Sequence, residues 1–491
     1  MTDRGMDLDG KRVTVMGLGT RGGGVGVSRW LIERGARVTV TDGQPDTALG
    51  ESLAALAGLP IRYVLGGHRE EDFRPAGADL VVRNPGVPRR AAMLGVARAS
   101  GVPVEMEMSL FLRHCPAPVI GITGTKGKTT TASLCAAMLR EWEASTVLAG
   151  NMGVSALGQL GRIGVGTPVV LELSSWQVEG LIEHGISPAI AVITNVHEDH
   201  LDHYDGFADY AGVKRGLVAH QGREDVAIVN RADPEAWAAS DVTGGRVVPF
   251  ATADRGGAGA WAAGDKLLWR VGEDEVTFDR PGGLALAGAH GAANALAAMA
   301  AALCRGATPE AVAAGLASFG GVRDRLEPVA ERDGVSFVND TAATAPAAAA
   351  AAMDALAGRR VHLLAGGADK RLDLAPLVAA VGRAASVTLL AGTATDRLLP
   401  MLVAARPGAP APPVHHEMGA AVRAAAGMAG PGDVVLLSPG CASFGLFRDE
   451  FDRGERFRRA VADLAGDGEP VRAEPGTTGE SPHPGDHSAG E

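Results

Sequence analysis

The sequence repeats one pattern along most of its length, in which a short apolar run ends in Gly, Asn or Ser and leads into an alanine-rich stretch. Clear examples of the runs are RVTVMGLG, PVIGITGTKG, PVVLELSS, AIAVITNV and DVVLLSPG. A β-branched run followed by a helix-forming stretch is typical of a β–α unit, and successive units build a parallel sheet. The pattern therefore predicts an α/β protein with mostly parallel sheets. Ligands of such sheets bind beyond the carboxyl ends of the strands.

The chain is too long for a single domain, because 491 residues exceed what one hydrophobic core usually supports. Glycine or proline interrupts the helical pattern near residues 114–119 and 320–325. We therefore expect three domains: a Rossmann-like domain over 1–115, a P-loop ATPase-like central domain over 116–321 and a Rossmann-like domain over 322–465. Residues 466–491 have almost no large apolar side chain, so burial cannot offset their ordering entropy, and we expect a disordered tail.

Composition limits the class of partner. The net charge of -11 shows no basic footprint for nucleic acid or an anionic membrane. No run of eighteen apolar residues and no signal-peptide core occurs, and the four cysteines form no C-x-x-C pair. We expect a cytoplasmic, soluble monomer with free thiols that acts on small molecules.

The first strand leads into a glycine-rich turn, Gly17-x-Gly19-x-x-Gly22, and the second strand ends in Asp42. This is the dinucleotide-binding fingerprint in its βαβ context. An NAD-dependent dehydrogenase and a purely structural tight turn are both compatible with it. By itself the motif indicates only that a diphosphate or similar anion can bind at a helix N-terminus.

A second glycine-rich segment, GITGTKGKTT at 121–130, resembles a phosphate-binding loop but has Ile122 where the usual pattern has its first glycine. It lies between the strand PVIGIT and a helical stretch, so we expect backbone N–H groups of residues 124–127 to be exposed at a helix N-terminus. Lys128 would reach the β and γ phosphates and the Thr129 hydroxyl would coordinate Mg²⁺. The alternative is a glycine-rich turn without a ligand. The expected ATP-binding residues here are Gly124, Thr125, Lys126, Gly127, Lys128, Thr129 and Thr130.

Further segments follow in a fixed order: GNMG at 150–153, ELSSWQVE at 172–179, NVHEDHLDHY at 195–204, and later NDT, GGADK and SPGCASF. Together with TGTKGKTT, this series resembles the Mur ligases, cytoplasmic ATP-dependent amide ligases that build the peptidoglycan precursor. The order and spacing are most similar to the glutamate-adding members, over about residues 8–465. The resemblance implies that glutamate is joined to UDP-N-acetylmuramoyl-L-alanine through an acyl phosphate. D-glutamate is the expected amino acid, and L-glutamate with later epimerisation is the alternative.

Four residues are expected to carry the catalysis: Lys128, Glu172, His200 and Lys214. Glu172 ends an apolar strand and offers hard oxygen ligands for Mg²⁺ beside Thr129. By resemblance, His200 binds a second Mg²⁺, and Lys214 carries a carbamate that helps to hold this ion. The alternatives are a surface glutamate, a zinc site in HEDH and an ordinary exposed lysine.

The resemblance also implies the remaining contacts. Those to ATP are made by His290, Asn294, Arg325, which reaches the phosphates, and Asp340, which meets the ribose. Those to glutamate are made by Thr344, Lys370 and Ser443, although each could be a turn or cap residue. The chain departs from the family pattern at Gly291, Asp324 and Ala342, where asparagine, histidine and lysine are more usual.

For the UDP-substrate, the resemblance assigns the diphosphate to Gly17, Gly19 and Gly22. It assigns the uridine region to Asp42, Asn84 and Gly86, and the rest of the nucleotide sugar peptide to Asn151. Asp42-Gly43-Gln44 departs from the more frequent Asp-Thr-Arg.

Two further alternatives belong to other classes. A catalytically dead ATP-binding scaffold is disfavoured because Lys128, Glu172, His200 and Lys214 are all present. Folylpolyglutamate-type ligases share the central loop but lack the N-terminal βαβ unit. Gly320 and Gly321 predict a hinge before the last domain, because glycine has the widest backbone freedom.

Overall fold

The computed structural model describes residues 6–20, 22–152, 155–200, 203–282, 286, 288–406, 408 and 410–464. The tail expected at 466–491 lies outside the described residues, as does Gly153 of the GNMG segment. The chain forms two compact units, and the boundary between them along the sequence falls between Phe319 and Gly320. The boundary directly precedes the Gly320-Gly321 pair, and the hinge expected there stays a prediction.

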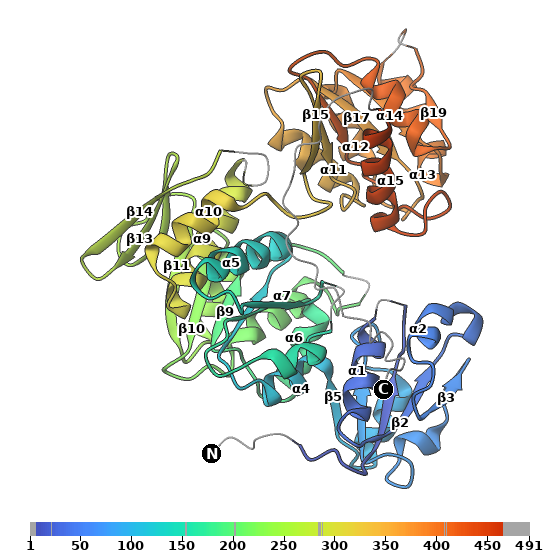
Figure 1. Ribbon diagram of the computed structural model, residues 1–491, viewed down its shortest axis with the longest axis vertical. Coiled ribbons are helices and arrows are strands. Elements are labelled where there is room, and N and C mark those ends of the chain that lie inside the picture. Colours follow the sequence, from blue (N-terminus) through green and yellow to red (C-terminus); the bar gives the residue numbers. More distant parts are fainter. Residues whose placement is uncertain are drawn as a thin grey trace, which may run out of the picture. The chain divides into compact units, whose positions relative to one another are not determined.

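The N-terminal part of the first unit contains a parallel sheet in the order β3-β2-β1-β4-β5 (Figure 1). Its strands are β1 (Arg12–Met16), β2 (Arg37–Asp42), β3 (Ile61–Leu65), β4 (Leu80–Arg83) and β5 (Val104–Met106). Its helices are α1 (Gly23–Ile32), α2 (Gly50–Ala55), α3 (Ala92–Ala99) and α4 (Glu107–His114). Strand β1 is central, so the glycine turn that follows it lies at the middle of the carboxyl edge.

The second sheet of this unit has the order β14-β13-β12-β11-β10-β9-β6-β8-β7. It is parallel from β7 to β12, and the last three strands are antiparallel. The strands are β6 (Val119–Thr123), β7 (Val147–Gly150), β8 (Val169–Glu172), β9 (Ile190–Ile193), β10 (Val226–Asn230), β11 (Arg246–Ala251), β12 (Gly259–Ala263), β13 (Lys266–Val271) and β14 (Asp274–Asp279). The helices are α5 (Lys128–Trp142), α6 (Ser175–Glu183), α7 (Phe207–Arg215), α8 (Pro234–Trp237), α9 (Gly288–Arg305) and α10 (Pro309–Ser318).

Helices cover both faces of this sheet because the central strands are apolar on both sides. In β8, Val169 and Leu171 belong to the core formed with α4, α6 and α7, whereas Val170 belongs to the core formed with α5, α9 and α10. Side chains alternate between the faces of a strand, so an unbroken apolar run fills both cores. The buried alanines of α9 let this helix pack closely against the sheet.

The second unit contains a sheet in the order β15-β16-β20-β17-β18-β19, parallel except for the β15–β16 pair. The strands are β15 (Glu327–Arg332), β16 (Val335–Asn339), β17 (Val361–Gly366), β18 (Ser386–Leu390), β19 (Val414–His415) and β20 (Val434–Leu437). The helices are α11 (Pro346–Ala355), α12 (Ala375–Arg383), α13 (Thr393–Ala405), α14 (Met418–Ala426) and α15 (Glu450–Asp463). Side chains of α14 and α15 form one core with the sheet.

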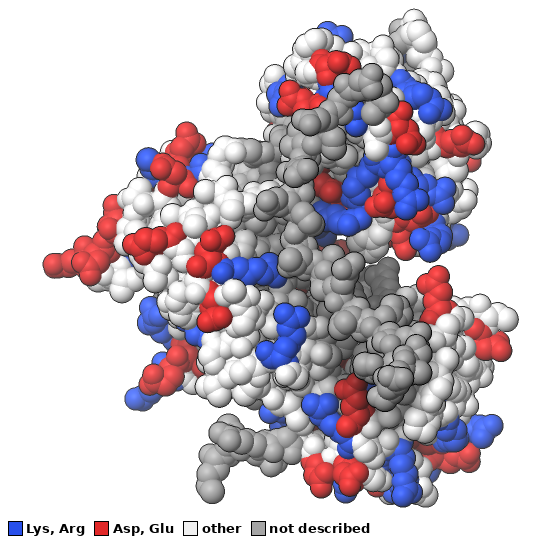
Figure 2. All heavy atoms as spheres, viewed as in Figure 1, with Lys and Arg blue, Asp and Glu red and all other residues white. Residues whose placement is uncertain are grey.

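The predicted fold class is confirmed: the chain is α/β, with mostly parallel sheets in three domains. The antiparallel strands β13, β14 and β15 were not predicted, nor was β12, which pairs parallel with β11 and antiparallel with β13. Acidic and basic side chains are interspersed over the visible face of each unit (Figure 2). No helix in the described part of the chain is long and apolar enough to span a membrane.

Candidate active site

The loop between β6 and α5 has the predicted strand–loop–helix geometry in spite of Ile122. Ile122 lies inside β6 and is buried between β8 and β9, so the loop itself begins only at Gly124. Gly124 (φ 151°) and Gly127 (φ 83°) have left-handed backbone conformations. A Cβ at Gly124 would collide with Thr194, and one at Gly127 would collide with Asn294. Both glycines are therefore required by the loop.

Two of the four amides expected to be exposed in this loop are already bonded. The N–H groups of Thr125 and Lys126 donate to the backbone oxygen and to Oδ1 of Asn195, both at 2.9 Å. Asn195 lies just after the end of β9, the strand next to β6, and its side chain bonds the loop to that end of the strand. The expectation is therefore wrong for Thr125 and Lys126, and an anion would bind nearer to the first turn of α5, at Lys128, Thr129 and Thr130, whose N–H groups have no intrahelical acceptor.

Lys128 folds back over the loop. Its Nζ donates to the backbone oxygens of Gly124, at 2.9 Å, and Thr125, at 3.1 Å. The ammonium group is thus held above the backbone turn at the N-terminus of α5. This arrangement gathers positive charge where phosphate groups would bind.

Glu172 ends β8, the neighbour of β6 and β7 in the sheet, and its side chain is 3% exposed. Asn151 donates its backbone N–H to the Glu172 backbone oxygen at 2.9 Å and its side-chain Nδ2 to Oε1 at 3.3 Å. The other carboxylate oxygen, Oε2, is buried and has no hydrogen-bond partner among the described residues. A buried carboxylate oxygen without a donor suits a hard cation such as Mg²⁺. The surface position considered as an alternative for Glu172 is wrong.

Lys214 is 1% exposed in α7, so the alternative of an ordinary exposed lysine is also wrong. Its Nζ lies 4.8 Å from the ring centroid of Tyr210. Burial lowers the pKa of Lys214 well below its usual value, and the charges of Lys128 and Lys126 lower it further, against the opposing effect of Asp199. The fold thus brings Lys214 near the phosphate-binding loop in a form that favours the neutral, nucleophilic amine.

His200 lies in a segment with an unusual backbone, since its φ is 52°. Its imidazole lies 5.1 Å from the Trp176 ring, centroid to centroid, and 3.9 Å from an Asp199 oxygen. Residues 201 and 202 of the HEDHLDHY segment lie outside the described residues. Within the described ranges, no three His, Cys, Asp or Glu side chains are grouped as a metal site.

Helix α9 brings Asn294 to the phosphate-binding loop. Asn294 Oδ1 accepts a hydrogen bond from Thr131 at 3.4 Å and packs against Gly127. His290 lies exposed in the first turn of α9. A Cβ at Gly291 would collide with the backbone of Leu286, so this backbone leaves no room for the more usual asparagine.

A cavity of about 430 Å³ opens at the carboxyl edge of the first sheet, where Gly17, Asp42 and Gly86 contribute to its lining. Both carboxylate oxygens of Asp42 accept hydrogen bonds from backbone amides. Oδ2 accepts from the N–H groups of Leu18 and Gly19, at 2.8 and 3.1 Å, and Oδ1 accepts from the N–H group of Gln44 at 2.9 Å. Asp42 therefore shapes the glycine turn, in which Gly17, Gly19 and Gly22 all have left-handed φ values.

Asn84 supports the same cavity from the β4 side. Its Oδ1 accepts from the Gly86 N–H at 3.2 Å, and its Cβ lies against Gly17, where a side chain on the glycine would collide. The structure thus brings Gly17, Asp42, Asn84 and Gly86 together at this strand edge, whereas Asn151, also predicted for the UDP-substrate, lies after β7 of the second sheet and bonds to Glu172.

His68 also lines this cavity and was missed from the sequence. The Thr41 hydroxyl donates to the Gly67 backbone oxygen at 3.1 Å and lies 2.8 Å from His68 Nδ1. The contact with Thr41 orients the imidazole ring in the cavity lining. His68 lies just after the end of β3, and Asp42 lies at the end of β2. Because ligands bind beyond the carboxyl ends of parallel strands, this position could have identified His68 as a site residue from the sequence.

In the second unit, Asp340 follows β16 and is buried. Its Oδ2 accepts from the Ser438 hydroxyl at 2.7 Å and its Oδ1 from the Leu326 N–H at 3.2 Å. Burial raises the pKa of Asp340 to about 6, although these two hydrogen bonds and the Arg325 charge act to lower it. Arg325 itself is exposed beside this carboxyl group.

The residues expected to bind glutamate also come together. Lys370 Nζ donates to the Thr344 hydroxyl at 3.0 Å. The GGADK and SPGCASF segments pair through Ala368 and Ala442, whose backbones exchange hydrogen bonds of 2.9 and 3.1 Å. Ser443 is buried directly after this pair.

Three family models match successive parts of the chain. They are the MurD-like N-terminal domain of Mur ligases over residues 11–105, the Mur ligase middle domain over 122–302 and the Mur ligase glutamate ligase domain over 324–441.

Curated relatives match over nearly their whole length. The UDP-N-acetylmuramoylalanine–D-glutamate ligase of Roseiflexus sp. (strain RS-1) is 49% identical over 468 residues, which cover 93% of this chain and 99% of the relative. The enzyme of the same name from Anaeromyxobacter dehalogenans (strain 2CP-C) is 40% identical over 94% of this chain and 99% of the relative.

Solved structures share the fold at low identity. UDP-N-acetylmuramate–alanine ligase MurC from Thermotoga maritima has a TM-score of 0.57 at 18% identity, covering 93% of this chain and all of that one. E. coli FolC in complex with ADP has a TM-score of 0.53 at 17% identity, covering 73% of this chain and 93% of that one.

Proposed function

Because the chain belongs to the Mur ligase family and is an ATP-dependent ligase that adds glutamate to UDP-N-acetylmuramoyl-alanine, we propose that the amino acid is D-glutamate and that the reaction passes through an acyl phosphate. The observation that carries the mechanism is the common location of Lys128, the buried carboxylate of Glu172 and the buried amine of Lys214 in one α/β domain. The enantiomer rests on the names of the relatives, which are D-glutamate ligases.

The chemistry needs activation because a carboxylate does not acylate an amine by itself. In the first step, an oxygen of the alanine carboxylate attacks the γ-phosphorus of ATP and ADP leaves. In the second step, the glutamate amine attacks the acyl carbon, phosphate leaves with that oxygen, and the nitrogen loses a proton. Both steps concentrate negative charge, so the protein must supply positive charge and exclude water.

We assign this positive charge to Lys128 and to the N-terminus of α5. The loop before the helix consists of Gly124, Thr125, Lys126 and Gly127, and Thr129 and Thr130 belong to the first helical turn. Thr129 and Glu172 would hold one Mg²⁺, and His200 with a modified Lys214 would hold a second. Bound Mg²⁺ supplies charge neutralisation on the phosphate oxygens. The orphan Oε2 of Glu172 supports this assignment.

The proposed modification of Lys214 is a carbamate. The neutral Nζ attacks carbon dioxide, a nitrogen–carbon bond forms, and one proton is released to solvent. The product is an anion that the charges of Lys128 and Lys126 would attract, whereas the same charges disfavour the protonated amine. The neighbouring lysine charges, and not burial, favour the carbamate, because burial disfavours any charged form of this side chain.

The remaining assignments follow the ligand chemistry. We propose that His290, Asn294, Arg325 and Asp340 contact ATP, and that Thr344, Lys370 and Ser443 bind the glutamate carboxylates. We propose that the UDP-substrate contacts Gly17, Gly19, Gly22, Asp42, Asn84, Gly86 and Asn151. We also propose that the protein acts as a cytoplasmic monomer on these small molecules alone.

A phosphate-release assay with UDP-N-acetylmuramoyl-L-alanine, ATP and Mg²⁺ tests the enantiomer. D-glutamate and L-glutamate are supplied in separate reactions, and the amide product is verified by mass spectrometry. The proposal predicts ligation with D-glutamate and none above background with L-glutamate. Ligation of L-glutamate alone would overturn the enantiomer and leave the ligase chemistry intact.

A further inference from the structure

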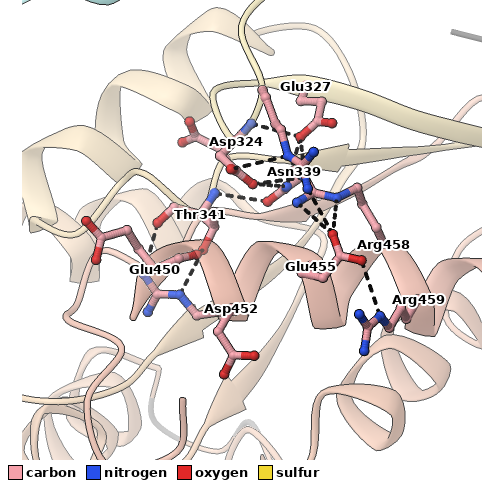
Figure 3. A network of polar contacts seen from close by, with 12 residues as sticks. Asp324, Glu327, Asn339, Thr341, Glu450, Asp452, Glu455, Arg458 and Arg459 are labelled. Carbon is pink, nitrogen blue, oxygen red and sulfur yellow. Dashed lines mark hydrogen bonds and ion pairs between the residues drawn. The ribbon is translucent and has the colours of Figure 1, made fainter. Parts of the chain in front are cut away.

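Two carboxylates at the start of the second unit share one buried set of donors (Figure 3). Asp324 Oδ1 accepts from Asn339 Nδ2 at 2.8 Å and from Arg458 Nη1 at 2.9 Å. Glu327 Oε2 accepts from the same two groups, at 3.0 and 2.8 Å, and also from the Asp324 N–H at 2.8 Å. Arg458 belongs to α15, so the last described helix is tied to the turn over residues 322–326.

Helix α15 approaches this turn closely because residue 454 is glycine. A Cβ on Gly454 would collide with Asp324 Oδ1 and would lie 2.7 Å from Thr341 Cγ2. One turn of the helix away, Arg458 is 18% exposed at its side chain, whereas its neighbour Arg459 is 73% exposed. The contact with the turn is thus made by one face of α15.

The turn needs this support because its backbone is strained. Asp324 (φ 67°) and Leu326 (φ 43°) both lie in the left-handed region, which disfavours residues with a Cβ. They flank Arg325. A pair of such residues persists only when surrounding contacts hold it, and the contacts to Asp324 come from Arg458, Asn339 and Glu327.

The turn in turn contacts Asp340. The Leu326 N–H donates to Asp340 Oδ1 at 3.2 Å, and the Ala342 N–H donates to the Asp324 backbone oxygen at 3.0 Å. Asn339, which binds Asp324, directly precedes Asp340. A displacement of the turn would therefore move Arg325 and one hydrogen-bond donor of Asp340 together.

We propose that Arg458 and Gly454 are positioning residues for ATP: they hold the Asp324 turn, and through it the orientation of Arg325 and Asp340. The inference rests on the proposed function, in which Arg325 and Asp340 contact the nucleotide. It also explains the aspartate at position 324, because a carboxylate there pairs with the guanidinium of Arg458.

The test is steady-state kinetics of Arg458→Met in the full chain, with Arg459→Met as the matched control on the same helix. Within the described part of the chain, Arg459 makes no polar contact of its own with the turn, and its partner Glu455 also bonds to Arg458 and to Arg323 of the turn. Loss of the shared contacts should raise the KM for ATP roughly tenfold, because coupled hydrogen-bonded networks carry about 1–2 kcal/mol. The KM values for the UDP-substrate and glutamate, and kcat at saturating ATP, should change less than about twofold. Arg458→Lys should restore most of the ATP affinity.

A double variant separates positioning from general stability. If Arg458 acts through Arg325, Arg458→Met should add little to the KM for ATP once Arg325 is alanine. Gly454→Ala should reproduce the ATP defect by pushing the turn from the helix side. Additive effects, or equal changes in all three KM values, would overturn the proposal, as would normal ATP kinetics in Arg458→Met. If Arg458→Met does not fold, Gly454→Ala decides by the same criteria.

The single variant Arg325→Ala distinguishes a failure of this inference from a failure of the proposed function on which it rests. An unchanged KM for ATP in Arg325→Ala would contradict the nucleotide assignment itself. A raised KM in Arg325→Ala together with a normal one in Arg458→Met would contradict the positioning inference alone.

Discussion

The side-chain amide of Asn151 donates to Glu172 Oε1 at 3.3 Å and leaves Oε2, the buried oxygen, without a partner among the described residues. This relationship orients the carboxylate: one oxygen is fixed to the loop after β7, and the other is directed elsewhere. A substitution that keeps the size of the Glu172 side chain and removes its negative charge therefore tests the role of the charge alone.

Glu172→Gln keeps the shape and removes the charge. We expect activity to fall by about 10²-fold or more, because metal-assisted charge stabilisation amounts to several kcal/mol. The loss should be partly offset at high Mg²⁺. Phosphate release across a Mg²⁺ titration measures this, with exposed Glu141→Gln of α5 as the control. A variant with wild-type activity and wild-type Mg²⁺ dependence would remove Glu172 from the metal site.

Lys214→Ala should abolish ligation, and short carboxylic acids such as acetate or formate should restore part of it by replacing the carbamate. The measurement is ligation rate against acid concentration. Exposed Lys266→Ala in the β13–β14 hairpin serves as the control. Full activity of Lys214→Ala without any added acid would contradict the carbamate.

The unmodified Lys214 side chain should lower the free energy of unfolding when carbon dioxide and Mg²⁺ are absent. Its pKa in the folded protein is below that of the unfolded chain, so the unfolded state binds the proton more tightly and stability rises with pH between the two values. Lys214→Met should therefore raise the melting temperature by a few degrees at neutral pH, and by less near pH 10. Equal melting curves at neutral pH would show that the amine is well solvated.

Asp340 predicts a pH dependence of ATP binding. Its folded pKa of about 6 lies above its usual value of 3.8, so the folded state holds the proton more tightly and this group destabilises the fold as pH rises from about 4 to 6. Below about pH 6 the carboxylate acceptor is lost, and the KM for ATP should rise. Asp340→Asn should bind ATP more weakly and without this pH dependence. A KM for ATP that is flat from pH 5 to pH 8 in the unmodified protein would count against the role.

His68→Ala should weaken the UDP-substrate and leave ATP unaffected. The imidazole that Thr41 orients is lost, and we expect the KM for the UDP-substrate to rise by about 3- to 10-fold, the usual effect of one hydrogen bond. Calorimetry with UDP and kinetics with both substrates measure this, with exposed His416→Ala as the control. An unchanged KM for the UDP-substrate would exclude His68 from the site.

The sequence predicted what depends on local pattern. Apolar runs predicted many of the parallel strands, β1, β6, β8, β9 and β20 among them, but not β3, β5, β7 or β11. The glycines at 17, 19, 124 and 127 marked turns whose positive φ values only glycine adopts easily. Strands β12 to β14 were missed because β12 and β13 lead into no helical stretch and the three strands form an antiparallel edge outside the β–α pattern.

Contacts made by tertiary packing could not be predicted. No spacing rule brings Arg458 to Asp324, or Asn195 to the amides of Thr125 and Lys126, because these pairs are 134 residues apart in one case and about 70 in the other. The burial of Lys214 could not be predicted either, because a lysine in a helix is usually exposed.

The most direct test of the reaction follows the oxygen that the mechanism transfers. UDP-N-acetylmuramoyl-L-alanine with ¹⁸O in its alanine carboxylate is incubated with ATP, Mg²⁺ and D-glutamate, and the released phosphate is analysed by mass spectrometry. An acyl phosphate requires that each phosphate carries one oxygen from the labelled carboxylate. Unlabelled phosphate, formed in step with the amide product, would contradict the acyl-phosphate mechanism.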